Sequence, residues 1–231
     1  MLRRRLVTRG AAALAAAALL AACGGGNGLA GQSAGQIMTS TISALRHAHS
    51  VRLSGVVDQG PRTAHVDVTM FRNGDADGTF DLSGVTGSLV ISSGSVYMRG
   101  PARFWQVLTS IGGASLPGAA ATKLAGRWVI LPRGAASGFS SFSFKGFEAS
   151  LSKGRASLTK VGPKTVMGQQ AIGVKSPSNG TLWVSTTGTA YPIEVVSSNA
   201  KGTQRATFSD WNADSPPTAP AGAKSLTTIL G

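Results

Sequence analysis

The chain has 231 residues and carries 22 lysine and arginine residues against nine acidic ones, a formal net charge of +13 at pH 7. Its single cysteine, Cys23, excludes a disulfide within the chain. The basic residues are scattered and are not interleaved with aromatic ones, so the composition does not indicate a nucleic-acid-binding face and we expect no nucleic-acid partner.

Residues 1–22 have the order of a secretory signal peptide. A basic segment, which contains Arg3, Arg4, Arg5 and Arg9, precedes an apolar run of about 13 residues rich in alanine and leucine. A helix needs roughly 20 residues to cross a bilayer, so this run is too short for a lasting transmembrane anchor. We therefore expect residues 1–22 to be removed during export.

The four residues Leu20-Ala21-Ala22-Cys23 resemble a bacterial lipobox. In lipobox proteins the cysteine sulfur receives a diacylglyceryl group, the chain is cut before the cysteine, and the new amino terminus is often acylated as well. Two or more acyl chains, such as palmitate, give stable anchoring. We expect an exported lipoprotein held by Cys23 on the extracytoplasmic face of the cell membrane, with a formal charge of +9 after cleavage. An ordinary signal peptide with a chance cysteine is the alternative.

Residues 23–35 are rich in glycine, asparagine, serine and alanine, which predicts a flexible, lipidated tether. Residues 26–31 match the glycine pattern of dinucleotide-binding proteins, but that pattern requires a strand before it and a helix after it. Residues 36–231 are long enough for one domain with a sizeable core. Within it, residues 215–231 form a proline- and alanine-rich tail that we expect to lie over the domain surface.

Helical spacing of Met38, Ile42 and Leu45 predicts an amphipathic helix over residues 36–49. From Ser50 the period changes to two, which predicts short strands around Val51, Leu53 and Val57; Val66, Val68 and Met70; Phe80 and Leu82; Leu89 and Ile91; and Val96 and Met98. Turn signals separate these runs at Gly60-Pro61, Asn73-Gly74, Gly84 and Ser93-Gly94. Such a pattern is typical of an antiparallel meander.

The middle of the chain lacks this alternation. Residues 104–111 and 119–124 are predicted to be short helices, 127–131 a buried strand, and 138–151 is ambiguous between helix and strand. Alternation then returns at Ile172 and Val174, Leu182 and Val184, Ile193 and Val195, and Ala206 and Phe208. The sequence therefore predicts an α+β domain with one large antiparallel sheet and a few helices on one side.

The order of these features is similar to that of the LppX/LprG group of mycobacterial lipoproteins, within the LolA-like superfamily. The likeness lies in the lipobox, the first helix, and the segments Val96-Tyr97-Met98-Arg99-Gly100-Pro101, Leu124-Ala125-Gly126-Arg127-Trp128-Val129 and Phe208-Ser209-Asp210-Trp211-Asn212. The resemblance implies a strongly curved sheet, or half-barrel, with helices on its concave face and an apolar cavity between them.

The resemblance also implies a function, because members of this group bind acylated lipids or glycolipids and carry them across the cell envelope. We therefore expect a monomeric, non-enzymatic lipid carrier without a cofactor, with an envelope transporter as a further partner. The pattern of apolar residues predicts that the cavity is lined by Leu53, Val66, Val68, Met70, Phe80, Leu82, Leu89, Ile91, Val96, Met98, Trp128, Ile130 and Phe142. The alternative is a surface lipoprotein that binds a protein partner and has no lipid ligand.

Other chemistry is weakly indicated. Residues 73–78 match the first half of a calcium loop, but Gly84 stands where a glutamate should bind, so a hairpin turn is the better interpretation. His47 and His49 lack further ligands for zinc, and no Gly-x-Ser-x-Gly elbow is present. The phenylalanine-rich segment from Phe139 to Phe147 is either core or a mobile mouth through which lipid enters.

Overall fold

The computed structural model describes residues 26–59, 62–111, 114–132, 139, 143–153, 155, 157–177, 180–199 and 202–231. The strands are β1 Ser50–Gln59, β2 Arg62–Phe71, β3 Ala76–Leu82, β4 Val85–Ser92, β5 Ser95–Arg99, β6 Val129–Ile130, β7 Thr159–Val166, β8 Gln169–Ser176, β9 Gly180–Ser185, β10 Pro192–Asn199, β11 Gly202–Ser209 and β12 Lys224–Ser225. The helices are the 3₁₀ turn η1 Leu29–Gly31, α1 Ala34–His47, α2 Ala102–Ile111, α3 Gly118–Leu124, α5 Phe144–Lys153 and α6 Leu226–Leu230.

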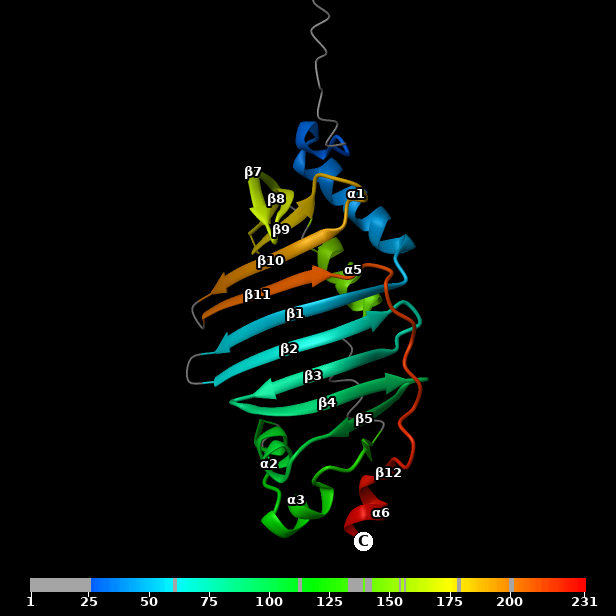
Figure 1. The fold of residues 1–231 in the computed structure, drawn as a ribbon. Helices are drawn as coiled ribbons and strands as arrows, with labels where there is room; N and C mark the ends of the chain where they lie inside the picture. Colours follow the sequence, from blue (N-terminus) through cyan, green and yellow to red (C-terminus); the bar gives the residue numbers. More distant parts are fainter. Residues whose placement is uncertain are drawn as a thin grey trace, which may run out of the picture.

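All of these strands form one 12-stranded sheet in the order β12-β6-β5-β4-β3-β2-β1-β11-β10-β9-β8-β7. Two meanders, β1 to β5 and β7 to β11, lie side by side because the last strand of the second pairs with the first strand of the first. Leu53 on β1 is thus flanked by Val68 on β2 and by Phe208 on β11. Figure 1 shows α1 and β7 to β9 at one end of the molecule and α2, α3 and α6 at the other.

One face of the sheet, called the inner face here, is apolar across most strands. Successive side chains of a strand point to opposite faces, so every second residue belongs to this face. The register places Val129, Met98, Leu89, Val68 and Leu53 in one row across the sheet, and these side chains are buried or half-buried. Other parts of the chain must therefore pack on the inner face to keep it from water.

Helix α1 covers the inner face at the β8–β9 end. It begins with a capping box, in which the Gln36 backbone N–H donates to Ser33 Oγ and the Ser33 N–H donates to Gln36 Oε1. Its apolar residues share a buried cluster with residues of β8 and β9: Ile37, Met38, Ile42 and Leu45 with Ile172, Val174, Leu182 and Val184. The amphipathic helix predicted over residues 36–49 is confirmed, with its start two residues earlier.

Helices α2 and α3 cover the other end of the inner face. The Phe104 ring of α2 lies so close to Gly87 and Gly100 that a Cβ added there would be 2.3 Å and 2.5 Å from ring atoms. Glycine at these positions makes room for the ring, which is fully buried beside Trp105, Ala121 and Leu124. Both short helices predicted in the middle of the chain are confirmed.

The α+β class with a large, mostly antiparallel sheet and helices on one face is confirmed, and β6 with β12 is a parallel pair. The half-barrel expectation is wrong, because the sheet is open and is not strongly curled. Its edges are β12 and β7, and two separate buried clusters lie along its inner face, one with residues of α2 and α3 and one with residues of α1. The ambiguous segment is helical from Phe144.

Both ends of the described chain lie against the sheet. Residues expected to be a free tether are packed from Gly26 onward, and the Leu29 side chain is buried, so the flexible-tether prediction fails for that part. The tail follows the ends of β1 to β4: the Asn212 N–H donates to the Ser50 carbonyl oxygen, and Ser92 Oγ donates to the Pro217 carbonyl oxygen. Over the described ranges, none of the helices has the length and apolar character needed to cross a membrane.

Candidate functional site

An apolar pocket of about 210 Å³ lies between the inner face, α1 and α5. Its lining comes from α1, α5, β1 and the strands β8 to β11, elements that are far apart in the sequence. The lining residues are Met38, Leu53, Phe147, Ser150, Leu151, Val174, Ser176, Gly180, Leu182, Val195, Ala206 and Phe208. Only the serine hydroxyls and backbone groups offer polar contacts, so the pocket suits a hydrocarbon segment better than a charged group.

Stacked aromatic rings form one wall of this inner pocket. The Phe147 ring of α5 stacks on the Phe208 ring of β11 with centroids 4.8 Å apart. Phe208 in turn lies 6.4 Å from Trp211, which stacks on Tyr191 at 4.3 Å and donates its Nε1–H to the Pro192 carbonyl oxygen. Phe147 and Phe208 line the pocket, and the row of rings continues beyond it to Trp211, in the segment after β11.

Two arginines contact residues in the first half of α5, and Leu151 in its second half is buried. Arg72, in the turn after β2, donates to the carbonyl oxygens of Leu45 and Ala48 at the end of α1, and its guanidinium lies 4.7 Å from the centre of the Phe144 ring. Arg46 of α1 pairs with Glu148 at 2.8 Å, and Arg46 is 65% exposed. An exposed ion pair contributes little to stability, so the contacts that retain α5 are chiefly apolar.

One buried donor in the described part of the protein has no acceptor. The indole Nε1–H of Trp105 on α2 is buried and makes no hydrogen bond. An unsatisfied buried donor costs about 1–3 kcal/mol. A carbonyl oxygen of a bound molecule would remove this cost.

Most residues predicted to line a cavity lie on the inner face. These are Leu53, Val66, Val68, Met70, Phe80, Leu82, Leu89, Ile91, Val96 and Met98, and among them Leu53 lines the inner pocket. The others belong to, or pack against, one buried cluster that also includes Trp105 of α2, Leu124 of α3 and Phe144 of α5.

Trp128 and Ile130 do not belong to this set, and their prediction is corrected. Val129 pairs with Met98 and takes the inner face, so Ile130, opposite Tyr97, takes the outer one. The Arg99 guanidinium lies 5.0 Å from the centre of the Trp128 ring. Because residues 128–131 are apolar throughout, the sequence held no alternation that could separate the two faces. Phe142 lies outside the described residues.

Sequence reasoning missed much of the pocket lining. Val174, Leu182, Val195 and Phe208 stood out as strand residues, but nothing in their spacing showed that β8 to β11 would face α5. Phe147 lay in the segment interpreted as core or as a mouth. Its side chain is half-buried, and it lines the pocket.

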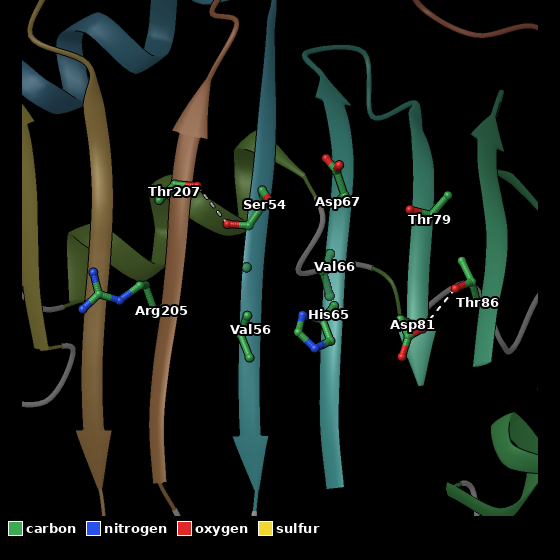
Figure 2. Close-up of a pocket in the computed structure, with 11 residues that line it drawn as sticks. Ser54, Val56, His65, Val66, Asp67, Thr79, Asp81, Thr86, Arg205 and Thr207 are labelled. Carbon is green, nitrogen blue, oxygen red and sulfur yellow. Dashed lines mark hydrogen bonds between the residues drawn. The ribbon is translucent and has the colours of Figure 1, made fainter. Parts of the chain in front are cut away.

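A second, polar groove of about 450 Å³ lies on the outer face, across β11, β1, β2, β3 and β4. Figure 2 shows its side chains projecting from neighbouring strands, with Thr207 donating to the Ser54 carbonyl oxygen and Thr86 to Asp81. Its charged groups already have protein partners: Arg205 pairs with the buried Glu194, and Asp67 with Arg52.

Arg52 donates two hydrogen bonds to Asp67, from Nε at 2.7 Å and from Nη2 at 2.6 Å. These bonds hold the pKa of the Asp67 carboxyl below its usual value, and the same contact raises the pKa of Arg52. On β3, burial is the main cause that raises the pKa of Asp77, and the charge of Asp214 adds to it.

The candidate calcium loop is a hairpin turn, as predicted. The Asp75 carboxylate accepts hydrogen bonds from the Ser93 backbone N–H at 2.9 Å and from the Asn73 side-chain amide at 2.9 Å. Gly74 has a φ of +92°, which favours glycine. Across the described ranges, no group of three or more histidine, cysteine or acidic side chains is placed to hold a metal ion.

No protein-family model and no curated protein matches the sequence. The fold is similar to that of LprF from Mycobacterium bovis, with a TM-score of 0.53 and 18% identity over 82% of this chain and 97% of that one. It is also similar to the lipoprotein LppX from Mycobacterium tuberculosis, with a TM-score of 0.52 and 15% identity over 79% of this chain and 96% of that one. At these identities the comparison shows a shared fold.

Proposed function

We propose that this protein is a membrane-anchored lipoprotein that binds the acyl chains of a lipid or glycolipid against the inner face of its sheet and carries them across the cell envelope. The observation that carries the proposal is the apolar pocket beneath α5, in a fold shared with the lipoprotein LppX. The lipobox supplies the anchor: residues 1–22 are removed as a signal peptide and Cys23 is acylated.

The size of the pocket limits the ligand that it can hold while α5 lies against β11. We call this the closed arrangement. An apolar cavity of about 150 Å³ stays dry and binds benzene, so about 210 Å³ accommodates a short hydrocarbon segment. Sites for larger ligands usually exceed about 300 Å³. Binding of a whole acyl chain therefore requires α5 to move away from β11. Movement of α5 would also take Phe144 out of the buried cluster that it shares with Val68 and Met70 of the inner face, which would extend the apolar surface beside the pocket.

The driving force is removal of hydrocarbon from water, about 25 cal/mol per Å² of apolar surface. Because the lining offers few polar partners, selectivity depends on the number and length of acyl chains more than on the headgroup. The unpartnered Trp105 N–H is a candidate donor to a carbonyl oxygen of an acyl ester.

Native mass spectrometry of the purified, acylated protein tests this proposal. We expect a noncovalent lipid in addition to the covalent chains on Cys23. Ala206→Leu, which fills the pocket, should lower lipid retention ~10-fold, about 1.4 kcal/mol. Thr207→Leu is the matched control, because the adjacent residue points to the outer face. Absence of lipid from the wild-type protein, or equal retention by both variants, would contradict the proposal.

The outer groove favours a second candidate, a surface lipoprotein that binds a protein partner and has no lipid ligand. The groove is larger than the inner pocket and is lined by polar side chains such as His65, Asp81 and Thr79. Under this candidate the purified protein carries no lipid, and Thr207→Leu rather than Ala206→Leu changes partner binding.

A further inference from the structure

The chain that follows Cys23 is tied to the sheet almost at once. Gly26 forms a bridge with Thr187, and the Asn27 backbone N–H donates to the Thr186 carbonyl oxygen at 2.8 Å. The Asn27 side-chain amide donates to the carbonyl oxygens of Ser185, at 2.9 Å, and Gly188, at 3.1 Å. Residue 26 is therefore fixed on the loop between β9 and β10.

This attachment leaves a very short connection to the proposed anchor. From Cys23 to Gly26 there are three Cα–Cα steps, which span at most about 11 Å when fully extended. If Cys23 is acylated, as proposed above, the β9–β10 loop lies within that distance of the lipid-modified residue. The inference that follows rests on that acylation.

The turn between β7 and β8 lies next to this loop, at the same end of the strands. The Thr186 N–H donates to the Gln170 carbonyl oxygen at 2.9 Å, and Gln169 pairs with Val166, so Met167 and Gly168 form the turn. Their φ angles are +49° and +77°, as a type I′ turn requires. Among the described residues, Met167 is an exposed large hydrophobic side chain, with 61% of its surface in solvent.

Methionine is an unusual choice for this position. Asparagine, aspartate and glycine tolerate positive φ best, and methionine gains nothing from the turn geometry. Two further turns of this geometry in the described part of the chain, Ser83-Gly84 and Ser93-Gly94, have serine at the first position. Met167 thus serves neither the turn nor the core, and an apolar environment outside the protein would offset its exposure.

The surrounding part of the chain is free of unpaired acids. The sequence has no acidic residue before Asp58 and none between Glu148 and Glu194. Glu148 pairs with Arg46, and Glu194 pairs with Lys164 and Arg205. Lys164, on β7 near the turn, is paired with Glu194, and Lys160 and Lys175 lie toward the other ends of β7 and β8. The turn and the loop themselves carry no acidic side chain that an anionic membrane surface would repel.

We propose that the β7–β8 turn and the β9–β10 loop lie on the membrane surface that holds Cys23, with the Met167 side chain in the interfacial region. The short connection brings these two segments to the bilayer, the absence of acidic side chains in them permits contact with headgroups, and Met167 supplies the apolar contact. The opposite end of the sheet, with α2 and α3, then points away from the membrane (Figure 1).

A spin-label experiment tests this orientation. Cys23 is the only cysteine, so in the acylated protein Met167→Cys provides the one free thiol for a nitroxide label. In vesicles of phosphatidylglycerol and phosphatidylcholine, we expect the label at 167 to collide more with oxygen and less with a water-soluble nickel chelate than in detergent-free buffer. Ile111→Cys is the matched control: Ile111 is 53% exposed and lies on α2, which packs on β4, about 34 Å from β8 along the sheet.

Thr187→Cys, in the β9–β10 loop, is a second label site if the label at 167 perturbs the turn, and circular dichroism melts check that each variant is folded. Equal exposure of the labels at 167, 187 and 111 to the chelate, in protein that is acylated and vesicle-bound, would overturn this orientation and leave the proposed function standing. A mass spectrum without acyl groups on Cys23 would remove the anchor and this inference with it.

Discussion

The ring of Phe147 on α5 is stacked on the ring of Phe208 on β11, with centroids 4.8 Å apart and an angle of 22° between the planes. This pair joins the covering helix to the sheet at the wall of the inner pocket. It therefore both stabilises the closed arrangement and determines how easily the pocket opens.

Phe147→Ala should loosen α5. Loss of a half-buried aromatic side chain and its stack is expected to lower the free energy of unfolding by about 2–3 kcal/mol. For a chain of this size that corresponds to a fall of roughly 4–12 °C in melting temperature. A bound fluorescent fatty acid should dissociate faster, as stopped-flow measurements would show. Phe147→Leu is the control, and unchanged dissociation in both variants would contradict the role of this contact.

Trp105→Phe removes the buried N–H that has no acceptor while it keeps most of the ring. If the donor serves a ligand, the lipid-free protein should melt at the same temperature or higher, because the unsatisfied group is gone. Lipid retention should fall about 3- to 10-fold, the loss of one hydrogen bond. A lower melting temperature with normal lipid retention would show instead that Trp105 is a packing residue.

The pair formed by Arg52 and Asp67 predicts a pH effect. Because the folded pKa of Asp67 is below its unfolded value of about 3.9, its stabilising contribution is present above that value and is lost as the pH falls through the folded pKa. Asp67→Asn should cost about 0.5 kcal/mol at pH 7, since both side chains are partly exposed, and progressively less as the pH falls through the folded pKa. Denaturant unfolding over a series of pH values from 7 downward measures this difference.

Asp77→Asn is the control for Asp67→Asn, because the pKa of Asp77 is shifted in the opposite direction. The folded pKa of Asp77 is raised by burial and by Asp214, so its charged form destabilises the fold as the pH rises through the folded pKa. This variant should be at least as stable as the wild-type protein at pH 7. Equal losses of stability in the Asp67 and Asp77 variants would contradict both pKa directions.

Met167→Asn separates stability from membrane contact. Asparagine before Gly168 is the favoured pair in a type I′ turn, so the melting temperature should stay the same or rise. Removal of the apolar side chain should reduce contact with phosphatidylglycerol vesicles, seen as less protection of the β7–β8 turn from limited proteolysis. Unchanged protection would argue that Met167 does not touch the bilayer.

Much of the fold could be predicted from the sequence because the apolar residues of its helices and strands recur with clear periods. The alternation of Leu53, Val68 and Leu89 assigned strands, and the spacing of Met38, Ile42 and Leu45 assigned α1. The pairing of β11 with β1, which joins the two meanders, could not be predicted. It depends on contacts between residues about 150 positions apart, such as Leu53 and Phe208, and a local pattern carries no information on such contacts.

The site was harder to predict than the fold. The residues predicted to line a cavity lie on the inner face where polar neighbours alternate with them, whereas Trp128 and Ile130, in a segment that is apolar throughout, do not. The tether prediction failed from Gly26 because glycine- and serine-rich composition indicates flexibility, whereas the Asn27 side chain and the buried Leu29 attach the segment to the sheet. Such attachments depend on single residues rather than on composition.

Photo-crosslinking tests the central claim most directly, namely that the inner face beneath α5 holds hydrocarbon. The acylated protein is loaded with a fatty acid that carries a diazirine near the end of its chain, irradiated, digested and analysed by mass spectrometry. We predict crosslinks to lining residues of the inner pocket, Phe147, Val174, Leu182 and Phe208 among them. Crosslinks confined to the outer groove around His65 and Thr79, or none at all, would contradict the account.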